Sequence, residues 1–325
     1  MTRTSKSACF AVSALAVVAL AGCRMRGSAN GSFSRTFTVS GPVRLDLTNG
    51  SGDNQVSAGP AGEVQIHAEL HIKSWSTESG KRRAKEIEQN PPISQEGNLI
   101  RVGGFGKHTG DVSINYTIVV PPDTEIRGVT GSGDMEVNGI KGPANFTAGS
   151  GNISASNIAS DVQAIAGSGD LHFSNVQGQV QATAGSGNIS LDGVRGESRL
   201  QTGSGDLKVA QPGDAVVANT GSGKVTITGA STDLRLRSSS GDVVVDGNPG
   251  TSNYWDFHTG SGNVTLHVPS ASSFRFYAHT GSGSINAGIP IVMEGTAGKH
   301  ELRARIGDGK ARVEVETSSG NIAIR

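Results

Sequence analysis

Side chains that could do chemistry follow a glycine turn that recurs through the second half of the chain. Directly after the turns come Asp134, Asn152, Asp170, Asn188, Asp206, Lys224, Asp242 and Asn263. Spaced carboxylates could bind calcium, or a pair of them could cleave a glycosidic bond. However, amides and a lysine interrupt the column, and near-equivalent aspartates such as Asp170 and Asp206 do not separate an acid from a base. We therefore expect no enzyme, and we interpret the alternation as spacing of like charges on stacked strands.

Two histidines and two tyrosines form the candidate binding surface: Tyr254, His258, Tyr277 and His279. Each histidine precedes Thr-Gly-Ser-Gly in neighbouring repeats, which predicts that the two imidazoles stack and face solvent. A surface metal pair and an aromatic sugar-binding platform are alternatives. We expect no metal and no cofactor. The nearby Trp255, Phe257, Phe274 and Phe276 are expected in the core instead, because they lie in two longer repeats that need larger side chains to fill them.

The N-terminus has the pattern of a bacterial export signal. Arg3 and Lys6 precede an apolar run that ends in Leu20-Ala21-Gly22-Cys23. This end resembles a lipobox, which predicts a signal peptide at residues 1–22, an acylated Cys23 and a flexible tether over residues 23–35. Ordinary cleavage near Leu20 is the alternative. Because Arg24 rather than an aspartate follows the cysteine, we expect the protein in the outer membrane of a cell that has one.

Composition excludes several classes of protein. The 28 Lys and Arg residues balance the 28 Asp and Glu residues, so no basic excess exists to attract nucleic acid. The chain has only two cysteines, Cys9 and Cys23, which excludes a disulfide scaffold or a cysteine zinc site in the later part. Glycine is frequent, at 47 of 325 residues, but has no strict period of three, which excludes collagen.

The elements that must position these side chains repeat at a fixed interval. Copies of Gly-Ser-Gly-Asp begin every 18 residues from Gly131 to Ser239, and again at Gly260 and Gly281. Each repeat holds two stretches with apolar residues at every second position, which predicts two strands joined by turns. So short a unit cannot enclose a core alone, so the repeats must stack into a β-solenoid. We attribute the turn glycines to backbone angles that only glycine adopts easily.

The first half is organised differently. Residues 36–128 alternate as strands and contain one plausible helix, near residues 77–89, before Pro91-Pro92. We expect this region to begin the solenoid and to form its cap, and residues 129–325 to form the regular coils. The chain ends at Arg325 just after Ile322 and Ile324, without an obvious second cap. An open strand edge there could pair with another copy and form a homo-oligomer.

The order of these features resembles a known family. A lipobox, a strand pair with a Ser-Gly-Asp turn, a short helix, the segment Tyr116-Thr117-Ile118-Val119-Val120-Pro121-Pro122 and repeated Gly-Ser-Gly-Asp coils are similar to the bacterial putative-adhesin family of unknown function, which is related to auto-transporter adhesin head domains. The resemblance covers residues 36–325. It implies an envelope-associated, single-stranded, right-handed β-helix. It transfers no catalytic residue.

The resulting hypothesis is a lipid-anchored, non-enzymatic protein of the cell envelope. It would act as an adhesin-like scaffold that binds a protein or a glycan, because flat ladders of hydroxyls and amides suit such partners. An accessory protein of envelope-stress signalling is the alternative, since some relatives resemble one. A glycan-active β-helix enzyme is a third hypothesis. It predicts that product release is lost when Asp170 and Asp206 are replaced by asparagine.

Overall fold

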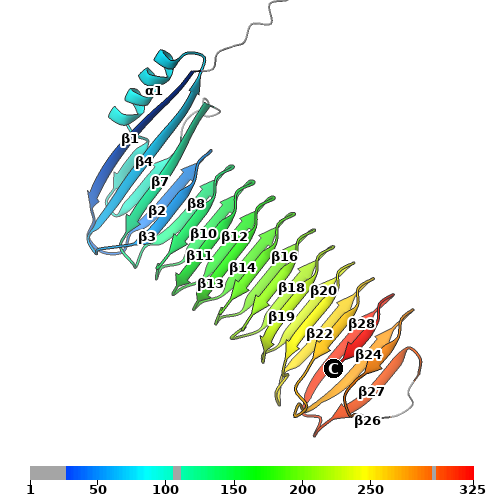
Figure 1. The fold of residues 1–325 in the computed structure, drawn as a ribbon. Helices are drawn as coiled ribbons and strands as arrows, with labels where there is room; N and C mark the ends of the chain where they lie inside the picture. The colour runs from blue at the N-terminus through cyan, green and yellow to red at the C-terminus, as the bar shows by residue number, and fades with distance from the viewer. Residues whose placement is uncertain (1–26, 105–110, 295–297) are drawn as a thin grey trace, which may run out of the picture.

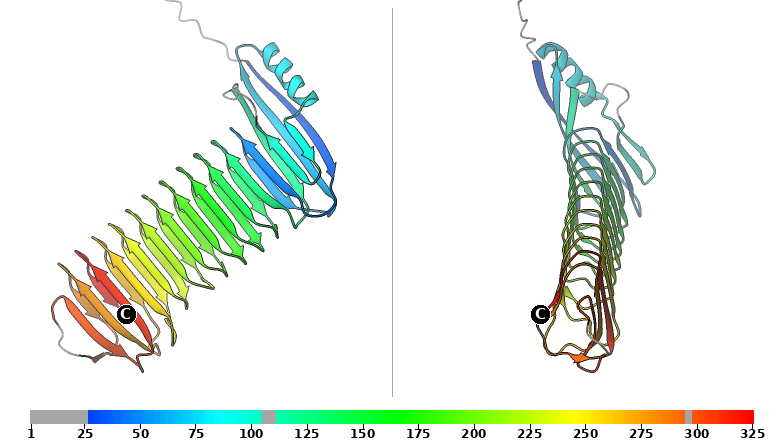
Figure 2. Two further views of the ribbon diagram at one scale, coloured as in Figure 1. Left: turned by 180° about the vertical axis from the view of Figure 1, so that it is seen from behind. Right: turned by 90° about the vertical axis from the view of Figure 1, so that its right-hand side faces the viewer.

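The computed structural model describes residues 27–104, 111–294 and 298–325. They form a long rod of stacked coils with a helix-bearing cap at its N-terminal end (Figure 1). Each regular coil contributes one strand to each of two facing sheets, sheet A and sheet B. Seen from the side, the rod is narrow, since the two sheets lie close together (Figure 2, right).

Sheet A has 14 described strands. Their spatial order is β1 (Gly27–Thr38), β4 (Glu63–Ser74), β7 (Val112–Val120), β3 (Asn54–Ala58), β9 (Met135–Asn138), β11 (Ile153–Ile158), β13 (Leu171–Val176), β15 (Ile189–Asp192), β17 (Leu207–Ala210), β19 (Val225–Ala230), β21 (Val243–Gly247), β23 (Val264–His267), β29 (Ile322–Ile324) and β25 (Ile285–Ala287).

Sheet B has 15 described strands. Their spatial order, from the C-terminal end of the rod, is β26 (Val292–Met293), β27 (Glu301–Ile306), β24 (Phe274–Thr280), β28 (Ala311–Thr317), β22 (Tyr254–Thr259), β20 (Leu234–Ser238), β18 (Val216–Thr220), β16 (Ser198–Thr202), β14 (Val180–Ala184), β12 (Val162–Ala166), β10 (Ala144–Ala148), β8 (Glu125–Thr130), β2 (Arg44–Asn49), β6 (Leu99–Gly103) and β5 (Ile93–Glu96).

The predicted all-β solenoid is confirmed. Strands of successive coils pair in parallel and keep the 18-residue register, as in Ala144↔Val162 and Val162↔Val180. Inward residues of sheet B are often alanine, such as Ala164 and Ala182, whereas sheet A provides larger side chains such as Phe173. Small and large residues thus share the narrow space between the sheets. The predicted aromatic fillers Trp255, Phe257, Phe274 and Phe276 are all buried.

The turn glycines have a steric cause, so our expectation of special backbone angles was wrong for the repeated turns. Gly133 and the equivalent glycines of later coils have no positive φ, whereas Gly52 in the early copy of the turn has φ +106°. A Cβ on Gly133 would lie 1.8 Å from the carbonyl oxygen of Gly52 in the adjacent coil, and one on Gly169 would lie 1.9 Å from that of Gly151. A buried threonine before many of the turns completes the corner: Thr202 Oγ1 accepts a hydrogen bond from the Gly205 N–H at 3.1 Å. The coils therefore stack closely only where the turn has no side chain.

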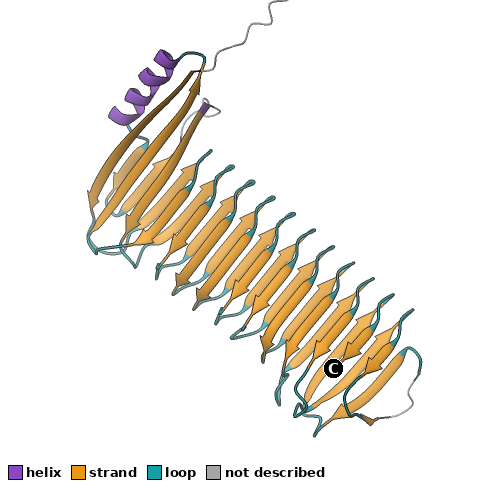
Figure 3. Ribbon diagram, in the orientation of Figure 1, coloured by secondary structure: helices purple, strands orange, loops and turns teal. Residues whose placement is uncertain are grey.

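The N-terminal cap contains the one helix among the described residues, α1 (Thr77–Gln89), as predicted (Figure 3). Ser76 caps it by accepting a hydrogen bond from the Ser79 N–H at 3.2 Å. Helix α1 is not long and apolar enough to cross a membrane.

The prediction of a flexible tether over residues 23–35 is wrong for residues 27–35. These residues belong to β1, which pairs antiparallel with β4 because its alternating residues, among them Phe33, bury one face.

The order of coils along the rod departs from the order of the sequence at both ends. β2 lies between β6 and β8, and β3 lies between β7 and β9. At the other end, β28 lies between β22 and β24, and β29 lies between β23 and β25. The first and last solenoid coils of the chain are therefore each held between two other coils (Figure 1).

This insertion corrects the expected C-terminal edge. Ile322 and Ile324 do not end the stack, because β29 pairs with β23 on one side and with β25 on the other. In sheet B, β24 is followed by β27 and β26, which pair antiparallel and form the cap that the sequence did not reveal. The strand at the C-terminal edge of sheet A is β25, only three residues long.

Candidate functional site

The four residues of the candidate binding surface all lie on the outer face of sheet B near the C-terminal end of the rod. Tyr254 and His258 come from β22, and Tyr277 and His279 come from β24. The two histidines do not stack as expected, because β28 separates their strands and places Glu316 in register with each of them. We define the charged patch as these four residues with Arg235, Arg237, Asp256, Arg312, Glu314 and Glu316.

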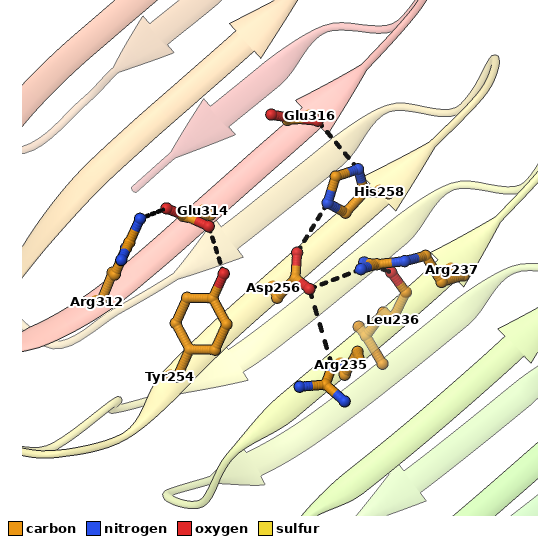
Figure 4. Close-up of polar contacts among 9 residues, drawn as sticks. All are labelled: Arg235, Leu236, Arg237, Tyr254, Asp256, His258, Arg312, Glu314 and Glu316. Carbon is orange, nitrogen blue, oxygen red and sulfur yellow. Dashed lines mark hydrogen bonds and ion pairs between the residues drawn. The ribbon is translucent and has the colours of Figure 1, made fainter.

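Asp256 is the centre of the charged patch (Figure 4). It is 6% exposed although it is on an outward face, because long neighbouring side chains cover it. Its Oδ2 accepts a hydrogen bond from Arg237 Nη2 at 2.7 Å, and Arg235 Nε lies 3.9 Å from the same oxygen. Its Oδ1 lies 2.9 Å from His258 Nε2. The carboxylate thus joins strands β20 and β22.

His258 continues this chain of contacts. Its other ring nitrogen, Nδ1, lies 3.1 Å from Glu316 Oε2 on β28. Each ring nitrogen faces a carboxylate oxygen, an arrangement in which a doubly protonated imidazole provides a donor to each. The contact with Asp256 is close but poorly aligned, since Asp256 Oδ1 accepts no hydrogen bond from the described residues. We regard it as an electrostatic contact.

Burial raises the pKa of Asp256, but Arg237 and then His258 oppose this and hold the pKa below its ordinary value. The two effects have different origins, since desolvation disfavours the charged form whereas neighbouring cations favour it. Asp256 is therefore ionised over the whole neutral range. Its charge is used within the protein to hold basic side chains from the adjacent coil.

The two tyrosine rings are covered by guanidinium groups. Arg312 lies over Tyr254 at 5.6 Å from the ring centroid, and Arg303 lies over Tyr277 at 5.3 Å. The Tyr254 hydroxyl also donates a hydrogen bond to Glu314. Burial, followed by this bond, raises the pKa of Tyr254 to about 12. A sugar could stack on these rings only after displacing the arginines, so the arrangement does not resemble a bare aromatic platform.

A shallow pocket of about 250 Å³ lies beside the histidines, lined by His258, Thr259, His279, Gly281, Glu316, Thr317 and Ser318. Its donor set mixes imidazoles, hydroxyls and one carboxylate. In the part of the chain that the structure describes, no group of three or more His, Cys, Asp or Glu side chains could hold a metal ion. The pocket offers polar contacts from imidazole, hydroxyl and carboxylate groups.

The aspartate and asparagine column is a hydrogen-bonded ladder. Asp134 Oδ1 accepts from the Asn152 N–H at 2.8 Å, and Asn152 Oδ1 accepts from the Asp170 N–H at 2.9 Å. The same contact recurs in Asp170, Asn188, Asp206 and Asp242. Either side chain can supply the acceptor. Each carboxylate thus accepts a hydrogen bond from the backbone of the next coil. The interpretation of the alternation as charge spacing did not include this role.

Sheet B also has a band of uncharged outward side chains, the neutral band, which the sequence motifs did not predict. The outward side chains of β10, β12 and β14 are all uncharged: Asn145, Thr147, Gln163, Ile165, Gln181 and Thr183. One column of residues in register contains Asn145, Gln163 and Gln181. The neighbouring column contains Ile165, whose side chain is 47% exposed. The sequence does contain the information, because the residues between the buried positions of these three strands are all uncharged. These residues do not form a recognised motif.

Comparisons with known proteins identify a family without giving an activity. A family model described as Toastrack DUF4097 matches residues 67–325. No curated protein matches the chain.

Three solved structures are among those similar to this chain. One is described as a putative lipid binding protein from Parabacteroides distasonis, with 12% identity and a TM-score of 0.44, covering 91% of this chain and 97% of that chain. A putative adhesin from Bacteroides fragilis has 10% identity and a TM-score of 0.33, covering 90% and 97%. A putative cell adhesion protein from Clostridium sporogenes has 13% identity and a TM-score of 0.24, covering 90% and 98%.

Proposed function

The chain belongs to the Toastrack DUF4097 family, and from that premise we propose that it is a lipid-anchored, non-enzymatic scaffold of the bacterial cell envelope that binds its partner, as an adhesin does, through a flat face of the solenoid. The observation that carries this proposal is the constant 18-residue register of the parallel strands of sheet B from β8 to β20. Outward side chains of successive coils line up in columns along the rod, as in Asn145↔Gln163 and Gln163↔Gln181.

The neutral band on β10, β12 and β14 is the proposed binding face. Its column of amides offers donors and acceptors at the spacing of adjacent strands, about 4.8 Å. A partner with repeated hydroxyl or amide groups can meet several of them together. Many weak contacts along one rigid face would then add up, as they do in multivalent binding. Glycan chains and extended protein segments have this chemistry.

A non-enzymatic role is supported by how the ionisable groups are used. The ladder carboxylates, such as Asp170 and Asp206, accept hydrogen bonds from the next coil and lie on an exposed corner. Asp256 is held by Arg237 and His258. A glycosidase needs two carboxylates with different roles flanking one bond. The equivalent corners of this rod do not separate an acid from a base.

The lipid anchor rests on the sequence alone, since Cys23 lies outside the described residues. An acyl chain on Cys23 would hold the N-terminal cap at a membrane, most simply the outer membrane, with the rod extending away from it. Metabolic labelling with radioactive palmitate tests this directly. We expect label on the wild-type chain and none on Cys23→Ser; label that persists on Cys23→Ser, or is absent from both, contradicts the anchor.

The adhesin-like role needs exposure to the outside of the cell. Antibody labelling of the protein on intact and on permeabilised cells measures this, with a periplasmic protein as the control for intactness. Labelling of intact cells supports an outward-facing adhesin. Labelling that requires permeabilisation contradicts it and instead supports a periplasmic scaffold, such as an accessory protein of envelope-stress signalling.

A further inference from the structure

The most exposed large apolar side chain of the described residues is on the N-terminal cap. Trp75 is 82% exposed, whereas the only other tryptophan of the chain, Trp255, is fully buried. Trp75 lies in the short connection between β4, which ends at Ser74, and α1, which begins at Thr77. An indole left in water at this position has no structural role that its own fold explains, which directs attention to what it could contact.

Trp75 is beside the point where the chain comes in from its N-terminal segment. Gly27, the first described residue, pairs with Ser74. A Cβ on Gly27 would lie 2.2 Å from the Thr77 backbone nitrogen, so the start of β1 touches the start of α1. Only four residue steps separate Gly27 from Cys23, which at full extension is at most about 14 Å. An acyl anchor on Cys23 would therefore bring the bilayer surface to Trp75.

The same end of the cap carries an excess of basic residues. Residues 73–89 hold five basic side chains against three acidic ones, a local charge of +2 in a chain whose net charge is zero. Lys81, Arg82 and Lys85 are exposed on α1, and none forms an ion pair with another described residue. Lys73 is also exposed, but it lies on the face of β4 opposite the one that α1 covers. Of the acidic residues, Glu88 is directed inward, where it accepts a hydrogen bond from the Ser32 N–H at 3.0 Å.

We propose that Trp75 and the exposed basic residues Lys81, Arg82 and Lys85 form a membrane-contact surface that binds an anionic lipid bilayer. Tryptophan favours the boundary between headgroups and acyl chains, where its ring is half in an apolar medium. Basic side chains are attracted to anionic headgroups, each strengthening binding about fivefold near the surface. The proposal extends the proposed function, because the anchor on Cys23 supplies the proximity.

Contact at this surface would fix the direction of the rod. The coils run away from the cap in one line (Figure 1). A single acyl tether would let the rod lie down or rotate freely. A second contact, through Trp75 and α1, would hold the cap on the bilayer and keep the neutral band on β10, β12 and β14 at a fixed distance above it.

The test uses the mature chain without acylation, residues 23–325 with Cys23→Ser, which contains every described residue. It is mixed with vesicles of phosphatidylcholine, with or without about 30 mol% phosphatidylglycerol. Vesicle flotation measures binding, and tryptophan emission measures insertion. Because Trp255 is buried and its indole donates to the Thr232 carbonyl oxygen at 2.8 Å, a blue shift on adding vesicles reports Trp75.

We expect binding to the anionic vesicles only, a blue shift, and loss of binding in about 0.5 M salt. Lys81→Gln with Lys85→Gln should weaken binding about 25-fold, and Trp75→Ala should abolish the blue shift. Matched controls remove similar exposed groups away from the N-terminal cap: Val292→Ala, and Lys208→Gln with Lys224→Gln. Unchanged binding in the cap variants, an effect equal in the controls, or no binding by the wild-type chain overturns the proposal.

Failure of this surface and failure of the lipid anchor are distinguishable. Vesicle binding by the unacylated chain does not depend on Cys23, whereas palmitate labelling does not depend on Trp75. If the surface instead joins two copies of the chain, sedimentation without lipid will show a concentration-dependent dimer that Trp75→Ala dissociates. That result, with no vesicle binding, overturns the membrane assignment.

Discussion

The Asp170 side chain accepts a hydrogen bond from the backbone N–H of Asn188, one coil further along the rod, at 2.8 Å. Asn188 repeats the contact with the Asp206 N–H at 2.8 Å. Such bonds explain why aspartate and asparagine share one column: each offers an oxygen of the same reach. They also explain why Lys224 is an interruption, since its side chain cannot accept a hydrogen bond.

Removing one acceptor should weaken the corner. We expect Asn188→Ala to lower the free energy of unfolding by about 1 kcal/mol, the typical net contribution of a hydrogen bond. Asn188→Asp keeps the acceptor but places three carboxylates in consecutive coils, so its cost should disappear in high salt. Urea unfolding measures both, with Ser186→Ala in the same exposed turn as control. Equal costs for both variants at high salt would contradict the acceptor role.

The close approach of coils gives a sharper prediction. A Cβ on Gly187 would lie 1.9 Å from the Gly169 carbonyl oxygen, whereas Gly193 has φ +65° and nothing within 4 Å. Gly187→Ala should therefore cost more than about 3 kcal/mol, because backbone must move. Gly193→Ala should cost about 1 kcal/mol, from the left-handed angle alone. Thermal unfolding of the two variants measures the difference. The reverse order would show that backbone angle, and not stacking, requires the turn glycine.

Asp256 should make the free energy of unfolding depend on pH in the acidic range. Burial raises its pKa, but Arg237 and His258 lower it below the unfolded value of about 3.9. The unfolded state therefore binds this proton more readily, and the contribution is fully present above that value and lost as pH falls through the folded pKa. Asp256→Asn should cost about 1–3 kcal/mol at pH 7, because it weakens hydrogen bonds to charged neighbours. Denaturant midpoints from pH 7 to pH 3 should show the two proteins converging; a gap that widens in acid would contradict the assignment.

The inserted coil of β28 and β29 should stabilise the C-terminal end of the rod. β28 contacts β22 and β24, and β29 contacts β23 and β25. Deleting residues 311–325 leaves β24 and β25 without their parallel partners. We expect loss of amide protection across residues 274–306 by hydrogen exchange, with the coils from β10 to β20 unchanged. Protection that is lost only next to residue 310 would mean that the coils follow the order of the sequence.

Much of the fold was predictable because each coil repeats the same physical pattern. The 18-residue period followed from the repeated turn, and the two strands of each coil followed from apolar spacing. Helix α1 followed from a stretch that ends before Pro91-Pro92, and the burial of Trp255 and Phe257 followed from the two longer repeats. The insertions at either end could not be predicted, since β28 and β24 have the same alternation and nothing in that alternation says which lies beside β22. Residues 27–35 look polar and small like a linker, yet Gly31 and Ala29 are small because α1 packs on them.

The candidate site was predictable in part. Alternation placed Tyr254, His258, Tyr277 and His279 on an outer face, and the structure agrees. Their relations to one another depended on the insertion of β28, which brings Glu316 between the histidines. Asp256 was missed because an outward position on a strand predicts exposure, whereas the arginines of β20 cover it.

The central claim is that a partner binds the neutral band of sheet B, and site-specific photo-crosslinking in living cells tests it most directly. A benzophenone side chain is placed at Gln163 on the band or at Gln177, an exposed corner residue of the same type. We predict that irradiation gives a discrete higher-mass adduct at position 163 and none at position 177. Absence of any adduct at position 163, or equal adducts at the two positions, would contradict the scaffold.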